Sequence, residues 1–323
     1  MTSITVLAGG VGGAKFVGGV RALAARRDLD ITVVANTGDD LWLTGLRVCP
    51  DLDSIMYALG GANDTVRGWG RADESERVSA ELTAYGVGWP WFTLGDLDLG
   101  THIARSAMLR DGLSLTEATS RLAARWDLGV TLLPATDDEV ETHVEFVGAS
   151  GAVETCHFEE WWVKYRASVP ARRFVQRGIE HARASEAALR AVTGADVVLV
   201  APSNPVVSIG TILNLPGMRE ALESTPAPVI GLSPIIGGRP VRGMADHCLA
   251  AIGVETSAEA VGRHYGARAT GGVIDGWLVD EVDAQAAAPL GAEGLPTRVV
   301  PLWMTDDSTT AEMVVAALDL AGV

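Results

Sequence analysis

The chain has 323 residues and a formal net charge of −16, so it is long enough to bury a large core and lacks the basic surface that a nucleic-acid-binding protein needs. Hydrophobic residues make up 48% of the sequence and charged residues 20%, the balance of an ordinary globular protein. No apolar run reaches the roughly 18 residues of a membrane span, and the N-terminus has no basic region of a signal peptide, so we expect a cytoplasmic protein without membrane or nucleic-acid partners.

The chain opens with a strand, a glycine-rich turn, a helix and a second strand. The residue pattern predicts these elements at Ser3–Ala8, Gly9–Gly13, Ala14–Arg27 and Ile31–Ala35. Such a unit implies a parallel sheet with a right-handed crossover.

Apolar residues then recur with a helical period. Helices are predicted at Asp53–Leu59, Glu74–Tyr85, Leu99–Arg110 and Ser114–Trp126. In the last of these, Ser114 and Glu117 have the spacing of a capping box.

Between residues 130 and 185 the pattern changes to short strands separated by Asp, Gly and Ser. The expected strands are Val130–Leu133, Thr142–Val147 and Val153–Trp162. We interpret 130–185 as a small α+β insertion subdomain. Residues 1–129 and 186–323 then form the core, a Rossmann-like α/β fold with a parallel sheet and helices on both faces.

The alternation of strands and helices returns after the insertion. Further strands are predicted at Asp196–Ala201, Pro228–Leu232, Gly272–Val279 and Thr297–Pro301, and further helices at Ser208–Leu213, Ala245–Ile252, Ser257–Tyr265 and Thr309–Leu320. Ligands of open parallel sheets lie beyond the carboxyl ends of the strands. We therefore expect the site to be built from the loops after Ala8, Ala35, Ala201 and Leu232.

The first of these loops is an anion-binding candidate. Its glycines are Gly9, Gly10, Gly12 and Gly13. Glycines let a strand turn sharply into a helix and let backbone N–H groups approach phosphate oxygens. Lys15, one of two lysines in the chain, adds a compact cation. A tight turn without any ligand is the alternative interpretation.

This loop does not have the dinucleotide fingerprint. Gly10 and Gly12 fit its first two positions, but the third falls on Lys15. The second strand ends in Asn36 instead of the acidic residue that would hold a ribose. A nicotinamide oxidoreductase is therefore disfavoured.

Four carboxylates follow the second strand, namely Asp39, Asp40, Asp51 and Asp53. Clustered carboxylates repel one another unless a cation lies among them, and carboxylates are usual ligands of Mg²⁺. We expect a metal at Asp40, Asp51 and Asp53, because the spacing of Asp51 and Asp53 in a turn aims both side chains at one ion. The alternative is local: Asp39 in a turn, and Asp51 or Asp53 as a helix cap.

Three later loops carry polar residues that are suited to a ligand. Their candidates are Asp96, then Ser203, Asn204 and Ser208, and finally Arg239 beside two glycines. Arginine clamps a phosphate or carboxylate through paired hydrogen bonds. Trp89, Trp91, Trp161 and Trp162 line a ring-binding wall or pack in the core.

The motifs occur in a recognisable order. They are Ala8–Lys15, Asn36–Asp40, Cys49–Asp53, Leu94–Asp98, Ala201–Pro205 and Ser233–Gly238. Together they resemble the CofD-like family of 2-phospho-L-lactate transferases, including its actinobacterial phosphoenolpyruvate-using members. Each motif alone is weak, but the ordered set spans nearly the whole chain.

The resemblance implies an enzyme of coenzyme F-420 biosynthesis. Its donor is lactyl- or enolpyruvyl-diphospho-5′-guanosine, its acceptor is the ribityl hydroxyl of the deazaflavin Fo, and GMP leaves. The resemblance also implies a Mg²⁺ requirement, with Mn²⁺ as a substitute. The Arg-rich, Lys-poor composition indicates a GC-rich genome, which favours the enolpyruvyl donor of the actinobacterial members. We also expect a homodimer.

The roles of the candidates follow from this reaction. The donor is expected to bind at Gly9, Gly10, Gly12, Gly13, Lys15, Asp96, Ser203, Asn204, Ser208 and Arg239. Asp39, Asp40 and Asp53 are the catalytic candidates, with Asp39 or Asp40 orienting the acceptor hydroxyl. A non-catalytic nucleotide-sugar-binding regulator of the related family is the alternative, and the acidic pair Asp51 and Asp53 favours the enzyme.

Overall fold

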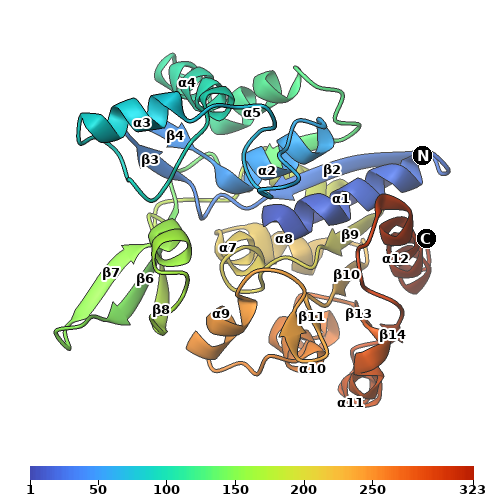
Figure 1. Cartoon of the computed structure of the whole chain (residues 1–323). Helices are drawn as coiled ribbons and strands as arrows, with labels where there is room; N and C mark the ends of the chain where they lie inside the picture. Colours follow the sequence, from blue (N-terminus) through green and yellow to red (C-terminus); the bar gives the residue numbers. More distant parts are fainter.

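Seven parallel strands form the central sheet of the computed structural model, which describes residues 1–323. They are β1 (Thr2–Ala8), β2 (Leu29–Ala35), β5 (Thr131–Pro134), β9 (Val197–Val200), β10 (Val229–Leu232), β13 (Gly276–Val279) and β14 (Thr297–Val299). Their order is β14-β13-β10-β9-β1-β2-β5 (Figure 1). The chain reverses its direction of growth between β1 and β9, so the loops after these two strands flank the position where such sheets bind ligands.

Helices cover both faces of the sheet. The core cluster on one face includes residues of α1 (Gly10–Ala24), α2 (Pro50–Leu59), α5 (Leu115–Ala123) and α12 (Asp307–Ala321). The cluster on the other face includes residues of α6 (Glu186–Gly194), α7 (Ile209–Asn214), α8 (Met218–Ser224), α9 (Ala245–Ala251), α10 (Ala258–Tyr265) and α11 (Ala287–Ala292).

The strands explain this division, because successive side chains of a strand point to opposite faces. In β1, Ile4 and Val6 belong to the first cluster and Leu7 to the second. The predicted Rossmann-like α/β core is therefore confirmed. None of the helices is both long and apolar enough to cross a membrane.

Four helices begin earlier than the sequence predicted: α1, α2, α4 (Asp96–Arg110) and α12. Helix α1 starts at Gly10 instead of Ala14, and α2 starts at Pro50 instead of Asp53. Proline is well suited to the first helical position, where its missing N–H leaves no bond unmade. As a consequence, Asp51 and Asp53 lie within the first turn of α2 and not in an extended segment before it.

The remaining elements lie outside the central layers. They are the hairpin β3 (Leu41–Leu43) and β4 (Leu46–Val48), helices α3 (Arg77–Ala84) and α4 (Asp96–Arg110), and the short pair β11 (Ile235–Ile236) and β12 (Arg239–Pro240). The hairpin was not predicted. The capping box of Ser114 and Glu117 at the start of α5 is confirmed.

A separate three-stranded antiparallel sheet projects to the side of the main sheet (Figure 1). Its strands are β6 (Glu141–Val147), β7 (Val153–His157) and β8 (Ala171–Arg177). The strand predicted at Val153–Trp162 ends at His157, and a short π-helix, η1 (Glu160–Lys164), follows it.

The strand near residue 131 belongs to the main sheet and not, as the sequence predicted, to the insertion. The sequence pattern predicts Val130–Leu133 as a strand of the insertion, but β5 pairs with β2 from Thr32–Thr131 to Ala35–Pro134 and forms the edge of the main sheet. Its apolar residues complete the core beside α5, which a strand of the small sheet would not do. With β5 in the main sheet, the insertion starts after Pro134 and not at residue 130, while its predicted end at residue 185 stays a prediction.

Candidate functional site

The glycine loop after β1 is tied to the loop after β9. The backbone N–H of Gly9 donates to Ser203 Oγ at 3.0 Å, and this hydroxyl donates to the carbonyl of Gly9 at 2.8 Å. A Cβ atom on Gly13 would lie 2.8 Å from Ser203 Oγ. Glycine is therefore needed here for the two loops to approach each other.

The same glycine loop adjoins Asp51 and Ser208. A Cβ atom on Gly9 would lie 2.6 Å from Asp51 Oδ2 and 2.7 Å from Ser208 Cβ. The backbone of Gly10 also hydrogen-bonds to the Asp51 carboxylate. The fold thus brings together the glycine loop, the first turn of α2 and the start of α7, which the sequence presented as separate parts of the site.

Asn36 connects the carboxylates of two different elements. Its Nδ2 donates to Asp51 Oδ2 at 2.9 Å and to Asp39 Oδ2 at 3.2 Å. Its Oδ1 accepts from the backbone N–H of Gly38 at 2.9 Å, which fixes the orientation of the amide. The residue that ruled out a ribose site in the sequence is therefore the centre of a carboxylate cluster.

Asp39 and Asp40 are buried and only partly satisfied. Oδ1 of each side chain is buried without a hydrogen-bond partner, and so is the hydroxyl of Thr37. Burial, together with the charge of Asp51, raises the pKa of Asp39 well above its usual range. Burial raises the pKa of Asp40 to about 7, although Arg47, with Nη2 at 3.4 Å from Asp40 Oδ2, opposes the shift.

A further buried carboxylate, Glu159, acts on Asp39 and Asp51 through its charge, and it was not among the residues predicted from the sequence. It lies between β7 and η1 and is only 8% exposed. Burial and the charge of Asp51 raise the pKa of Glu159 to about 8, and burial raises that of Asp51 to about 6. The one signal in the sequence was an acidic residue between Phe158 and Trp161.

These four carboxylates fit a divalent cation. Asp39, Asp40, Asp51 and Glu159 are all buried, and the charges of the other three raise the pKa of Asp39, so they cannot all stay ionised without a counter-charge. Arg47 supplies such a charge to Asp40 alone. The ligand atoms of the four do not share the 4.8 Å spacing found at Asp53, Asp98 and His102. The unpartnered oxygens of Asp39 and Asp40 are hard ligands of the kind that Mg²⁺ and Mn²⁺ prefer. The burial of unpaired oxygens is itself costly in a folded protein, and coordination would remove that cost.

Asp53 does not face this cluster. Two residues apart in a helix, Asp51 and Asp53 point in different directions. Asp53 Oδ2 accepts from Arg105 Nη1 at 3.0 Å, and its Oδ1 accepts from Nη2 of the same guanidinium. The expectation that Asp51 and Asp53 aim at one ion is therefore not met by the geometry.

Asp53 instead joins Asp98 and His102 in a second buried group, whose ligand atoms lie within 4.8 Å of one another. Such a triad has the composition of a metal site. Here, however, the guanidinium of Arg105 already supplies the positive charge, since it contacts both Asp53 and His102 Nδ1. We interpret this group as an internal ion-pair network.

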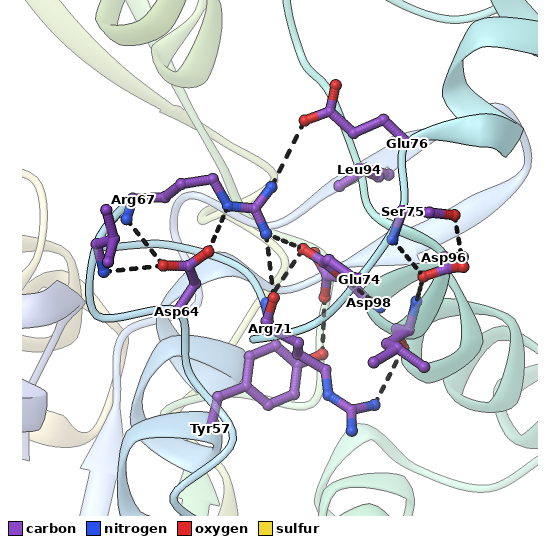
Figure 2. Close-up of polar contacts among 12 residues, drawn as sticks. Tyr57, Asp64, Arg67, Arg71, Glu74, Ser75, Glu76, Leu94, Asp96 and Asp98 are labelled. Atoms are coloured by element: carbon purple, nitrogen blue, oxygen red, sulfur yellow. Dashed lines mark hydrogen bonds and ion pairs between the residues drawn. The ribbon is translucent and has the colours of Figure 1, made fainter.

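Asp96 is a structural residue at the start of α4. Its carboxylate accepts from the backbone N–H of Ser75 at 2.9 Å and from the Ser75 hydroxyl at 2.7 Å. Beside it, Glu74 accepts from the backbone N–H of Asp98 at 3.2 Å and from Arg67 Nη2 at 2.7 Å (Figure 2). Asp96 thus fastens the preceding loop to the helix, and no contact joins it to the glycine loop.

The other predicted donor ligands divide into two groups. Lys15 and Arg239 are exposed and make no hydrogen bond or ion pair, so their charged groups are free. Asn204, in contrast, accepts from the backbone N–H groups of Val206 and Val207 at 3.0 and 3.3 Å. Its side chain shapes its own loop.

Comparison with known proteins gives one family and several relatives. The family model described as "2-phospho-L-lactate transferase CofD" matches residues 4–295. The chain is 55% identical over 318 residues to the phosphoenolpyruvate transferase of Streptomyces griseus subsp. griseus, with 98% of each chain covered. It is 51% identical over 338 residues to that of Mycobacterium avium, with 99% of each chain covered.

Among solved structures, the chain is similar to a crystal structure of a UPF0052 family member from Bacillus halodurans. The TM-score is 0.63 at 18% identity, and the match covers 98% of this chain and 100% of that one. Such a likeness shows a shared fold.

Proposed function

Because this chain belongs to the CofD family of transferases, we propose that it transfers the phosphoenolpyruvyl group from enolpyruvyl-diphospho-5′-guanosine to the ribityl hydroxyl of the deazaflavin Fo, with release of GMP. The names of the actinobacterial relatives support the enolpyruvyl donor over the lactyl donor. The deazaflavin acceptor and the guanosine donor rest on the family resemblance.

One observation carries the proposal at the level of residues. The buried carboxylate of Asp51 adjoins the glycine loop at the start of α1, and its charge acts on the buried Asp39 and Glu159. A diphosphate diester needs an anion-binding loop for its phosphates and a counter-charge for the group in transfer. The glycine loop and Asp51 lie at the same edge of the sheet, which supports the proposal.

Asp39, Asp40, Asp51 and Glu159 are the residues that would hold Mg²⁺ or Mn²⁺. When bound, the metal supplies charge neutralisation for the phosphoryl group in transfer. Asn36 keeps Asp39 and Asp51 at fixed positions through its two amide hydrogen bonds.

The protein's own residues bind and orient the two substrates. The N–H groups of the glycine loop, with the free ammonium of Lys15 nearby on α1, bind the diphosphate of the donor. The free oxygen of Asp39 or Asp40 accepts a hydrogen bond from the ribityl hydroxyl and orients it for attack. The new phosphodiester bond forms as the bond to GMP breaks, and the proton of the hydroxyl leaves to a carboxylate or to solvent.

The test is reconstitution with purified protein, enolpyruvyl-diphospho-5′-guanosine, Fo and Mg²⁺. The expected products are GMP and dehydro coenzyme F-420-0, identified by liquid chromatography and mass spectrometry. The product of the lactyl donor would be heavier by one pair of hydrogens, so the same spectrum decides between the donors. Absence of both products with either donor would refute the proposal.

A further inference from the structure

Glu159 is the one carboxylate of the proposed metal site that the insertion supplies. Asp39 and Asp40 follow β2 of the main sheet and Asp51 lies in α2, whereas Glu159 comes between β7 and η1. Asn36 holds Asp39 and Asp51 by hydrogen bonds. The Glu159 carboxylate makes neither a hydrogen bond nor an ion pair, and the neighbouring charge that acts on it is that of Asp51. The direction of this side chain is therefore set by its backbone.

A ring nitrogen of His157 holds that backbone. Nδ1 of His157 accepts a hydrogen bond of 3.1 Å from the backbone N–H of Glu159. His157 is the last residue of β7, and Glu159 already has the backbone angles of a helix, with φ −60° and ψ −35°. The N–H groups at the start of a helix have no partner within it, so the imidazole supplies one where the strand turns into η1. Loss of this bond would free the turn that carries the carboxylate.

The bond gives the two ring nitrogens different roles. A backbone N–H can only donate, so Nδ1 of His157 is the unprotonated nitrogen and the proton of the neutral ring is at Nε2. Nε2 is buried without a hydrogen-bond partner. A buried N–H that makes no bond costs free energy, so an apolar side chain would serve better if this position were needed only for packing. The nitrogen in use is the one that contacts Glu159.

Neighbouring rings keep the imidazole in place. His157 is only 6% exposed. The ring of His143 on β6 packs edge-on against it, with centroids 5.4 Å apart and 82° between the planes, and the ring centroid of Trp89 lies 6.2 Å away. His143 is itself held by Glu141, whose Oε2 lies 3.0 Å from its Nε2. An acceptor fixed in this way holds its partner at little further cost in conformational entropy.

We propose that His157 is a positioning residue for the metal site: its Nδ1 holds the backbone N–H of Glu159 and so directs the Glu159 carboxylate towards Asp51. The inference rests on the proposed function, in which Glu159 is among the residues that hold Mg²⁺ or Mn²⁺. It gives His157 the same role on the insertion that Asn36 has on the main sheet. Hydrogen-bond partners that orient metal ligands are worth about 10–100-fold in metal affinity, so loss of the Nδ1 acceptor should weaken metal binding by a factor in this range.

Two substitutions of His157 separate the hydrogen bond from the bulk of the ring. In His157→Asn the side-chain oxygen can accept from the N–H two residues later, as in an Asx turn, so the acceptor is kept although most of the ring is lost. In His157→Gln the side chain is closer to the ring in size, but its amide lies one methylene further out and the acceptor next to Glu159 is lost. A residue needed for packing alone would tolerate Gln better than Asn, because Asn leaves the larger cavity.

The test is the dissociation constant of Mn²⁺, measured by electron paramagnetic resonance on metal-free protein without substrates. We expect His157→Gln to raise this constant about 10–100-fold and His157→Asn to keep it close to that of the unchanged protein. Denaturant titration shows that each variant is folded. The control is His264→Gln on α10, outside the proposed site, which should bind Mn²⁺ as the unchanged protein does.

The Glu159→Gln background shows whether His157 acts through Glu159. Glu159→Gln alone should weaken Mn²⁺ binding, and His157→Gln should add nothing further in this background, whereas independent effects on the binding free energy would add. Three results would overturn the inference: unchanged affinity in His157→Gln, a loss in His157→Asn that equals or exceeds the loss in His157→Gln, and a full further loss in the double variant.

These outcomes are distinct from a failure of the proposed function. If the unchanged protein binds Mn²⁺ and forms the product, but the His157 variants bind Mn²⁺ equally well, only the role of His157 is wrong. If the unchanged protein binds no Mn²⁺, the metal site of the proposed function fails, and the role of His157 fails with it.

Discussion

Arg105 of α4 donates hydrogen bonds to the Asp53 carboxylate of α2 from both terminal nitrogens of its guanidinium, and the two side chains are buried. The same Nη1 donates to the backbone carbonyl of Arg47 at 3.3 Å. Arg47 lies in β4 and forms an ion pair with Asp40. The buried Arg105–Asp53 pair therefore fixes β4, whose Arg47 contacts a carboxylate of the proposed metal site. Burial favours the neutral form of Arg105, but the charge and hydrogen bonds of Asp53, together with the nearby Cys49 and Tyr57, outweigh it, and the pKa of Arg105 is raised.

We predict that Arg105→Leu lowers the free energy of unfolding by about 3–5 kcal/mol, because it leaves the carboxylate of Asp53 buried without its partner. Denaturant titration of the metal-free protein measures this. The matched control is Arg263→Leu, which removes a surface pair with Glu293 and should cost no more than about 1 kcal/mol. Equal losses of unfolding free energy in both variants would contradict the prediction, because the buried pair would then stabilise the fold no more than the surface pair does.

We predict that Asp39→Asn, Asp40→Asn, Asp51→Asn and Glu159→Gln each lower turnover, and that at least two of them do so about a hundredfold or more. Metal-free, the Asp39, Asp51 and Glu159 variants should be as stable as the unchanged protein or more stable, because each removes a repelled, buried charge. Asp40→Asn is the exception, because it leaves the buried Arg47 without its partner. Turnover and denaturant midpoints are measured on the same samples. Asp28→Asn, at an exposed surface position, is the control. Near-normal turnover in all four variants would place the chemistry elsewhere.

Removal of the divalent metal should abolish turnover, and Mg²⁺ or Mn²⁺ should restore it. The physical reason is the buried group of four carboxylates in a chain of net charge −16. Activity is measured after dialysis against EDTA and again after addition of each ion. Full turnover after exhaustive chelation would contradict the metal requirement.

The stability of the metal-free protein should fall as pH rises from about 4, the ordinary pKa of a carboxyl group, to about 8. Burial raises the pKa of Asp40 to about 7 and that of Glu159 to about 8. Between these limits the two carboxyl groups bind more protons in the folded chain than in the unfolded chain, so their titration with increasing pH favours unfolding.

Mg²⁺ should reverse this trend, because it binds the ionised carboxylates and its binding releases protons. Melting temperatures recorded with EDTA and with Mg²⁺ at several pH values test this. We expect the stabilisation by Mg²⁺ to be larger near pH 8 than near pH 5. A shift that is the same at every pH would argue against the carboxylate cluster as the metal site.

Lys15→Ala should raise the KM for the donor more than the KM for Fo. The Lys15 ammonium is exposed and unpaired on the first turns of α1, beside the loop that would bind the diphosphate. Initial rates with each substrate varied separately give both constants. Arg26→Ala, an exposed cation beyond the other end of α1, should change neither. Equal increases in both constants for Lys15→Ala would remove its proposed role at the donor.

Much of this architecture was determined by local sequence. The apolar run and glycines of Ser3–Gly13 specify a strand that turns sharply into a helix, and the structure has both. Parallel strands bring their carboxyl ends to one edge, which is why the loops of Gly9 and Ser203, far apart in the chain, could be expected to meet.

Other features depended on long-range contacts that no local pattern encodes. The strand at Thr131–Pro134 reads like those of the small sheet, and only its pairing with β2 assigns it to the main sheet. Asp51 and Asp53 have the same side chain and nearly the same position, yet the helical twist sends one to Asn36 and the other to Arg105. The sequence by itself determined the fold class and the loops of the site. The tertiary structure decided which carboxylates face one another and brought in Glu159, because burial and charge at a site depend on neighbours that are distant in the chain.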